Sequence, residues 1–232
     1  MAFFSSLGGI IKGIGNALTG TVSVVGGIWA DVFGRIIGGF GFIFDIIGLR
    51  LTKKLRMRFI ILSNGAAPVI PEANVLETFK LTKRVFMEQA KIELIKSETL
   101  TVFNSPEGAL NISSPVEGFL EQWTTAGNYL NGLAGFGFFT RRLSVIVVDT
   151  IEGGHDGRSY GPGTNFVVIE KSRFSDPKKT TLLVGHEMGH ACGLFIHRDQ
   201  KVNIMHEDGD RGEKMTWWQS NVVRNSKFVW YL

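Results

Sequence analysis

Residues 181–208 of the sequence read TLLVGHEMGHACGLFIHRDQKVNIMHED. This stretch contains a segment of twelve residues that holds three of the chain's five histidines, His186, His190 and His197. His186 and His190 are four positions apart, and residues with this spacing lie on one face of a helix. Both imidazoles can therefore point at one metal ion, and we predict that residues 180–194 form the helix that holds them.

Glu187 completes the pattern H-E-x-x-H with these two histidines. The 3.6-residue turn places it about 100° around the helix from His186, so its carboxylate reaches a metal-bound water rather than the metal. A zinc ion lowers the pKa of such a water, and a neighbouring carboxylate takes its proton as a general base. The pattern therefore predicts Zn²⁺ as cofactor, hydrolysis of a peptide bond, and Glu187 as the catalytic residue.

Gly193 is predicted to end the helix, because glycine adopts the left-handed conformation that turns the chain back. A third protein ligand just beyond this turn would leave the fourth position of the zinc ion to water, as in catalytic zinc sites. His197 is the predicted third ligand. Two alternatives stay open: Asp199 is the ligand instead, or the site is degenerate and has no catalytic activity.

These residues resemble the metzincin family of zinc metallopeptidases, whose pattern is H-E-x-x-H-x-x-G-x-x-H followed by a methionine turn. The chain departs from that pattern at one place, since the third histidine would fall at Ile196 and His197 comes one residue later. The resemblance covers roughly residues 58–232, and its specificity lies in residues 186–205. The positions in register are His186, Glu187, His190 and Gly193.

The resemblance implies further roles. The segment NIMHED puts Met205 in the methionine turn, as a soft floor under the ligands. Residues 215–226, MTWWQSNVVRNS, resemble the helix that follows this turn in the family. Residues 165–170, NFVVIE, resemble the edge strand that aligns an extended substrate by main-chain hydrogen bonds. The implied activity is zinc-dependent hydrolysis of peptide bonds in an extended protein or peptide.

The rest of the second region mixes strands and helices, so we predict an α+β domain with a small mixed sheet over residues 57–232. A glycine-rich loop is expected at residues 153–164. His155 and His206 are expected to be surface histidines, and they and Tyr160 are expected to have at most a minor role in binding substrate or stabilising an oxyanion. Cys192 is expected to be a small buried filler. The expected strands are 57–64, 97–104, 141–150 and 165–170, and the expected helices are 72–93, 116–133, 180–194 and 215–226.

Residues 1–56 have a different composition. Twelve of the 29 glycines lie between Gly8 and Gly48, among apolar residues that recur at helical spacing. Each helical glycine costs roughly 1 kcal/mol relative to alanine, so this helical segment needs a membrane, the second domain or further copies to stabilise it. We expect residues 7–49 to make a membrane or oligomer contact, with the basic residues of 50–58 near anionic headgroups.

Composition limits the remaining possibilities. The net charge of +4 is mild and the basic residues are not interleaved with aromatics, so a nucleic-acid partner is not expected. The N-terminal MAFFSS has no positive charge, so we recognise no signal peptide. The single cysteine leaves the compartment undetermined, and a particle or membrane location stays open. The alternative function is a structural or delivery component of a phage tail or injection particle, with a secondary or inactive peptidase module.

Overall fold

The computed structural model describes only part of the chain, and the predicted N-terminal helical segment falls mostly outside the described residues. Within the described part, no helix has both the length and the apolar character that crossing a bilayer requires. The predicted membrane or oligomer contact of residues 7–49 lies outside the described residues except at two positions. The structure describes Asp45, Gly48, 50–65, 67–112, 124–135 and 141–231.

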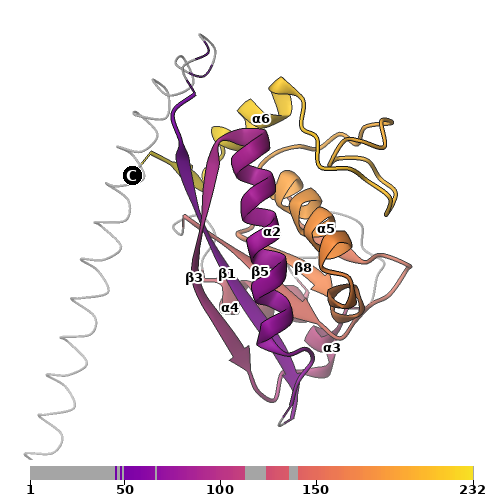
Figure 1. The fold of residues 1–232 in the computed structure, drawn as a ribbon. Helices are drawn as coiled ribbons and strands as arrows, with labels where there is room; N and C mark the ends of the chain where they lie inside the picture. The colour runs from indigo at the N-terminus through magenta and orange to yellow at the C-terminus, as the bar shows by residue number, and fades with distance from the viewer. Residues whose placement is uncertain are drawn as a thin grey trace, which may run out of the picture.

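One mixed sheet runs through the centre of the domain (Figure 1). The strands of its main body are, in spatial order, β3 (Ile92–Val102), β1 (Lys53–Asn64), β5 (Arg142–Val148), β8 (Phe166–Glu170) and β7 (Gly157–Ser159). The first four strands are parallel to one another, and β7 pairs antiparallel with β8. The short strands are β2 (Ala67–Pro68) and β9 (Val229–Trp230) on β1, and the separate pair β4 (Asn111–Ile112) and β6 (Thr150–Ile151).

Helices cover both faces of the sheet. On one face, α2 (Glu72–Ala90) and α5 (Pro177–Ala191) lie side by side (Figure 1), with the 3₁₀ helix Lys171–Ser175 leading into α5. On the other face are α3 (Glu107–Leu110) and α4 (Thr125–Ala134), while α6 (Trp217–Arg224) follows near the end of the chain. This arrangement of strands and helices confirms the predicted α+β class.

The central strand β1 shows why the chain folds in this way. Phe59 and Ile61 belong to the core under α2 and α5, whereas Ile60 and Leu62 belong to the core under α3 and α4. Successive strand residues point to opposite faces, and a strand covered on both faces is apolar throughout. The run FIIL in the sequence is therefore typical of a buried parallel strand, as predicted.

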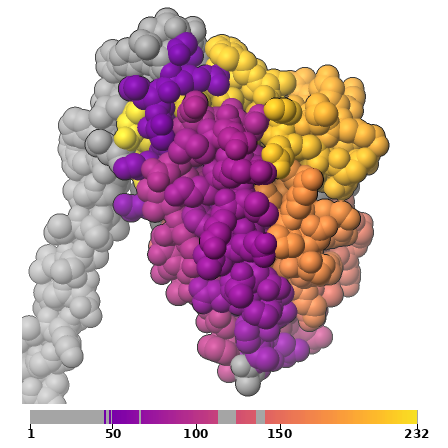
Figure 2. All heavy atoms as spheres, viewed as in Figure 1, coloured from indigo at the N-terminus to yellow at the C-terminus, as the bar shows by residue number. Residues whose placement is uncertain are grey.

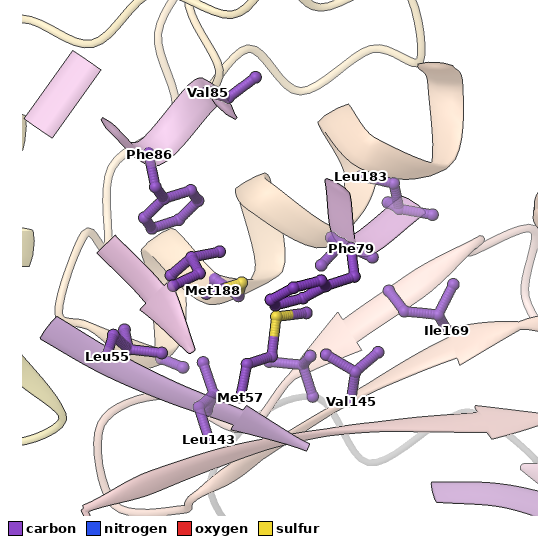
Figure 3. Packing of buried hydrophobic residues seen from close by; sticks show 14 of the residues in the cluster. Leu55, Met57, Phe79, Val85, Phe86, Leu143, Val145, Ile169, Leu183 and Met188 are labelled. Carbon is purple, nitrogen blue, oxygen red and sulfur yellow. The ribbon is translucent and has the colours of Figure 1, made fainter. Parts of the chain in front are cut away.

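The larger core lies between the sheet and the pair α2 and α5. In Figure 3, Met57 of β1 and Val145 of β5 point toward Phe79 of α2 and Met188 of α5. Phe79 also meets Phe59 edge to face, with ring centroids 6.5 Å apart. Burial of these side chains fixes α5 against the sheet, since each contributes about 1.5–3 kcal/mol when fully buried.

Several boundaries differ from the sequence prediction. Strand β1 begins at Lys53 rather than at residue 57, and α5 spans Pro177–Ala191 rather than residues 180–194. The helix expected to reach Glu93 ends at Ala90, because Lys91 adopts the left-handed conformation with φ 52°. The strand expected from residue 97 therefore begins earlier, at Ile92. Of the helix predicted for residues 116–133, the structure describes α4, and residues 113–123 lie outside the described residues.

The sequence prediction that residues 165–170 form the edge strand of the sheet is wrong. Residues 166–170 of this segment form β8, which is paired on both sides, with β5 and with β7. The edge of the described sheet on this side is β7, which lies inside the stretch predicted to be a glycine-rich loop. A three-residue strand of Gly, Arg and Ser has no apolar alternation, so its sequence carries no strand signal.

A buried charge cluster ties Asp45 to the domain. The Asp45 carboxylate lies 2.6 Å from Nη2 of Arg224 and 3.1 Å from Nζ of Lys53, and all three side chains are buried. Arg58 is also buried and bonds to Ser144 and to the carbonyl of Leu133. Two members of the basic stretch 50–58, Lys53 and Arg58, are therefore part of the interior rather than the surface.

Candidate metal centre

Helix α5 has clear signals at its start. Asp176 is the N-cap, and its side chain accepts hydrogen bonds from the amides of Lys178 and Lys179. Pro177 occupies the first helical position, where its missing N–H is not needed. The helix then runs almost entirely buried to Ala191, which holds His186 and Glu187 inside the domain.

Gly193 turns the chain immediately after the helix. Its φ of +102° lies in the region that favours glycine, and its amide donates to the carbonyl of His190. The amide of Leu194 donates to the carbonyl of Gly189, which closes the last turn. The chain leaving this turn passes back along the face of α5 that carries the histidines.

Three imidazoles converge beyond this turn. Nε2 of His190 lies 3.1 Å from Nε2 of His186 and 3.1 Å from Nε2 of His197. Tetrahedral zinc with Zn–N bonds of 2.0–2.1 Å requires ligand nitrogens about 3.3–3.4 Å apart. Among the described residues, these three form one of two groups whose ligand atoms are close enough to hold a metal ion.

The opposite ring nitrogens show which way the lone pairs face. Nδ1 of His186 lies 2.9 Å from the carbonyl oxygen of Ile204, and Nδ1 of His190 lies 2.6 Å from that of Leu194. A carbonyl only accepts, so both Nδ1 atoms carry protons and both Nε2 atoms present lone pairs. Two lone pairs 3.1 Å apart repel each other unless a cation lies between them, and this arrangement fits a metal ion.

Electrostatics favours the neutral form of these ligands. Burial, together with the nearby Arg211 and His190, lowers the pKa of His186 to about 3. Burial also lowers the pKa of His190 to about 4, against the opposing effect of its bond to Leu194. Metal binding requires neutral imidazole, so the site needs no proton release from these two rings at neutral pH.

His197 reaches the centre although it comes one residue late. Ile196, at the family's third-histidine position, is 73% exposed and points away from the domain. Arg198, the residue after His197, fixes the backbone here. Its amide donates to the carbonyl of Met205, and its carbonyl accepts from Nδ1 of His206. The exposed Asp199 is not part of the group that surrounds the metal position.

Met205 lies buried under the centre in a turn braced by α6. The amide of Met205 donates to Oδ1 of Asn203, and the Asn203 and Gln219 side chains exchange two hydrogen bonds. Gln219 also completes the capping box with Thr216 at the start of α6. Met205 was expected from the sequence, whereas the Asn203–Gln219 pair was not, because only the fold brings these two residues together.

Two glycines of α5 allow the turn to approach the helix. A Cβ on Gly185 would lie 2.5 Å from Cδ1 of Ile204, and one on Gly189 would lie 2.6 Å from the sulfur of Met205. A side chain at either position would force the Ile204 or Met205 side chain to shift. The four-residue spacing of glycines beside the two histidines is a sequence signal that we did not use.

Glu187 is buried beside β7, the edge strand of the sheet. A Cβ added to Gly157 would stand 3.2 Å from Cγ of Glu187, so the strand packs directly on this side chain. Burial raises the pKa of Glu187 to about 7, while Arg211, Arg158 and a backbone hydrogen bond from Ser159 oppose that rise. Arg211, which the sequence analysis did not single out, is thus the strongest opposing charge at the site.

Other residues considered from the sequence lie elsewhere. Tyr160 packs on Phe166 in the core under α3 and α4, on the sheet face opposite α5. His155 is exposed, whereas His206, expected at the surface, is buried. Cys192 is buried and its pKa is raised by burial to about 11, which agrees with a filler role.

Comparison with known proteins adds little. No protein-family model matches the sequence, and no curated protein matches it. Among solved structures, the chain is similar to metalloproteinase-II from Bacteroides fragilis, with 12% identity and a TM-score of 0.44 over 78% of this chain and 57% of that one. It is also similar to a chain in a chaperone–substrate complex, with 14% identity and a TM-score of 0.41 over 76% of this chain and 34% of that one.

The chain thus spans less than two thirds of the length of either structure. At these identities and TM-scores we draw no conclusion from the likeness about activity, and we base the function on the geometry of the site.

Proposed function

We propose that the chain is a zinc-dependent metallopeptidase of the metzincin type, which hydrolyses peptide bonds in an extended protein or peptide. The observation that carries this proposal is the convergence of the three Nε2 atoms of His186, His190 and His197. Their spacing suits tetrahedral zinc, and imidazole is a ligand that zinc accepts readily. Three protein ligands leave one coordination position open, as a catalytic site requires.

The residues around the site suit a hydrolytic reaction. When bound, zinc supplies a Lewis acid for the substrate carbonyl and lowers the pKa of a water that it coordinates. Glu187 takes the proton of the attacking water on its carboxylate and passes it to the leaving amine.

The edge strand β7 supports an extended substrate. It packs on Glu187 and Leu183 of α5. Within the described sheet β7 pairs with β8 on one side, and its other side is the edge. An edge strand presents main-chain groups to which an extended peptide can add as a further strand. A peptide held in this way would run past the histidines, with its scissile bond within reach of Glu187.

The decisive experiment is a Glu187→Gln variant. The substitution keeps the size of the side chain but removes the base, so we expect zinc content equal to wild type and a loss of peptide-library cleavage of about 10²–10⁴-fold. Glu77→Gln, at an exposed position on α2, is the matched control and should cleave like wild type. Persistent cleavage by zinc-loaded Glu187→Gln protein would rule out the assigned base.

The role of residues 7–49 remains a separate proposal, supported by their glycine-rich apolar pattern. We propose that they contact a membrane or further copies of the chain, which would also suit a delivery component of a larger particle. Flotation with anionic liposomes and size-exclusion chromatography of the full chain test this. A full-length protein that is monomeric and does not float would argue against both contacts.

A further inference from the structure

A second group of ligand atoms lies in the loop that follows the methionine turn. Nε2 of His206 lies 3.3 Å from Oδ2 of Asp208 and 3.8 Å from Oδ1 of Asp210. Ligand atoms of these three residues all lie within 4.8 Å of one another. The group shares no residue with the histidine centre, although it comes directly after Met205 in the chain.

His206 is oriented toward this group by its other nitrogen. Nδ1 lies 2.8 Å from the carbonyl oxygen of Arg198, so Nδ1 carries a proton and donates it. Nε2 is buried and has no hydrogen-bond partner, and the whole residue is 9% exposed. Nε2 therefore faces two carboxylates, which are acceptors. A neutral ring presents its lone pair to them, and this arrangement is repulsive unless a cation or a second ring proton lies between the groups.

The neighbouring basic side chains leave the position between these groups open. Lys201 lies 2.7 Å from Oδ2 of Asp210 and leaves Oδ1 of that residue turned toward His206. Arg211 donates from Nε and Nη2 to the carbonyls of Asp208 and Glu207, and so it shapes the loop without pairing with its carboxylates. The Asp208 and Asp210 side chains are mostly exposed, which leaves further coordination positions to water.

We propose that His206, Asp208 and Asp210 bind a second divalent metal ion, of the transition-metal class that includes Zn²⁺ and Mn²⁺. The imidazole favours these ions over Ca²⁺ and Mg²⁺, which take oxygen ligands almost exclusively. Two carboxylates would neutralise the ion, and one buried imidazole anchors the site in the domain. The separations of 3.3 and 3.8 Å are close to those between neighbouring ligands of such an ion, about 3.0–3.4 Å.

The second ion would stabilise the loop that carries the third ligand of the first. His206 holds the carbonyl of Arg198, and the amide of Arg198 bonds to the carbonyl of Met205. His197 is the residue before Arg198, so fixing His206 fixes the backbone from which His197 reaches the histidine centre. The proposed site is therefore structural, and it explains how an exposed loop keeps His197 in place.

Zinc stoichiometry of the full chain tests this proposal. After dialysis against metal-free buffer, elemental analysis should find about two zinc ions per wild-type chain, about one in His186→Ala/His190→Ala, and about one in Asp208→Asn/Asp210→Asn. Glu207→Gln, an exposed acid in the same loop, is the matched control and should hold as much zinc as wild type. Far-UV circular dichroism identifies any variant that has not folded.

Two results would overturn the proposal. One is that Asp208→Asn/Asp210→Asn holds as much zinc as wild type, and the other is that His186→Ala/His190→Ala holds none. In either case His206 is an imidazolium ion-paired with the two carboxylates and no second ion binds. If these variants do not fold, the single variant His206→Gln replaces them, with the same expected loss of one zinc ion. If instead the group of His186, His190 and His197 binds no zinc, the result differs, because His186→Ala/His190→Ala then holds as much zinc as wild type.

Discussion

The sulfur of Met205 occupies the space beside Gly189, where an added Cβ would stand only 2.6 Å from it. Met205 and α5 therefore meet at a position that only glycine can occupy without a shift. Gly185, one turn earlier on α5, has the same relationship to Ile204. Ile204 in turn holds His186 through its carbonyl oxygen.

Gly189→Ala should disturb this contact. Because Met205 is buried and packed, we expect a loss of about 1–3 kcal/mol in the free energy of unfolding, as for other overpacked cores. Urea denaturation followed by circular dichroism measures it. Gly132→Ala on α4 is the control, since a Cβ there meets nothing within 4 Å, and it should be neutral or stabilising by up to about 1 kcal/mol. Equal stability of the two variants would show that the contact does not constrain the turn.

The identity of the third ligand can be tested directly. We expect His197→Ala to weaken zinc binding by more than the 10–100-fold typical of losing an outer-shell partner, because a direct ligand is lost. Asp199→Asn should bind zinc like wild type, since Asp199 is not part of the ligand group. Competition with a chromophoric chelator measures both affinities. The reverse order of effects would assign the ligand to Asp199.

The buried charge cluster should make a large contribution to stability. Asp45→Asn leaves Arg224 and Lys53 buried without their carboxylate, and removing one partner of a buried pair costs about 3–5 kcal/mol. Arg84→Ala, which breaks the partly exposed pair with Glu213, should cost at most about 1 kcal/mol. Urea unfolding of the full chain compares them. A cost for Asp45→Asn as small as that of Arg84→Ala would mean that the cluster does not anchor Asp45.

The buried cluster of Asp45, Lys53 and Arg224 should also make the free energy of unfolding depend on pH. Burial raises the pKa of Asp45, but hydrogen bonds from Arg224 and Lys53 more than offset this, so the pKa lies below its ordinary value. A lowered pKa stabilises the folded state above the unfolded pKa, about 3.9, and that contribution is lost as the pH falls through the folded value. The stability difference between wild type and Asp45→Asn should therefore be constant from pH 5 to 7 and shrink below about pH 4. A difference that grows on acidification would contradict this sign.

Local sequence patterns predicted the parts of the site that depend on local structure. The H-E-x-x-H spacing fixes His186 and His190 on one helix face, and Gly193 with its positive φ ends that helix. The apolar run at residues 59–62 likewise predicted a buried strand, which is part of β1.

Features that depend on pairing between distant segments were not accessible from the sequence. The strand β7 is defined by its hydrogen bonds to β8, and the residues Gly157, Arg158 and Ser159 have no strand propensity of their own. The position of His197, one residue later than in the metzincin pattern, is accommodated by bonds between Arg198, Met205 and His206, which lie on two different loop segments. A one-residue shift in a loop cannot be judged from spacing alone, because loops absorb insertions through such contacts.

The central claim is that His186, His190 and His197 hold one zinc ion through their Nε2 atoms. Anomalous diffraction from crystals of the zinc-loaded protein, measured on both sides of the zinc absorption edge, tests it most directly. We predict an anomalous peak about 2.0–2.1 Å from all three Nε2 atoms, with Glu187 beside it but not bonded to it. Absence of a peak there, or a peak with the His197 ring turned away to solvent, would contradict the account.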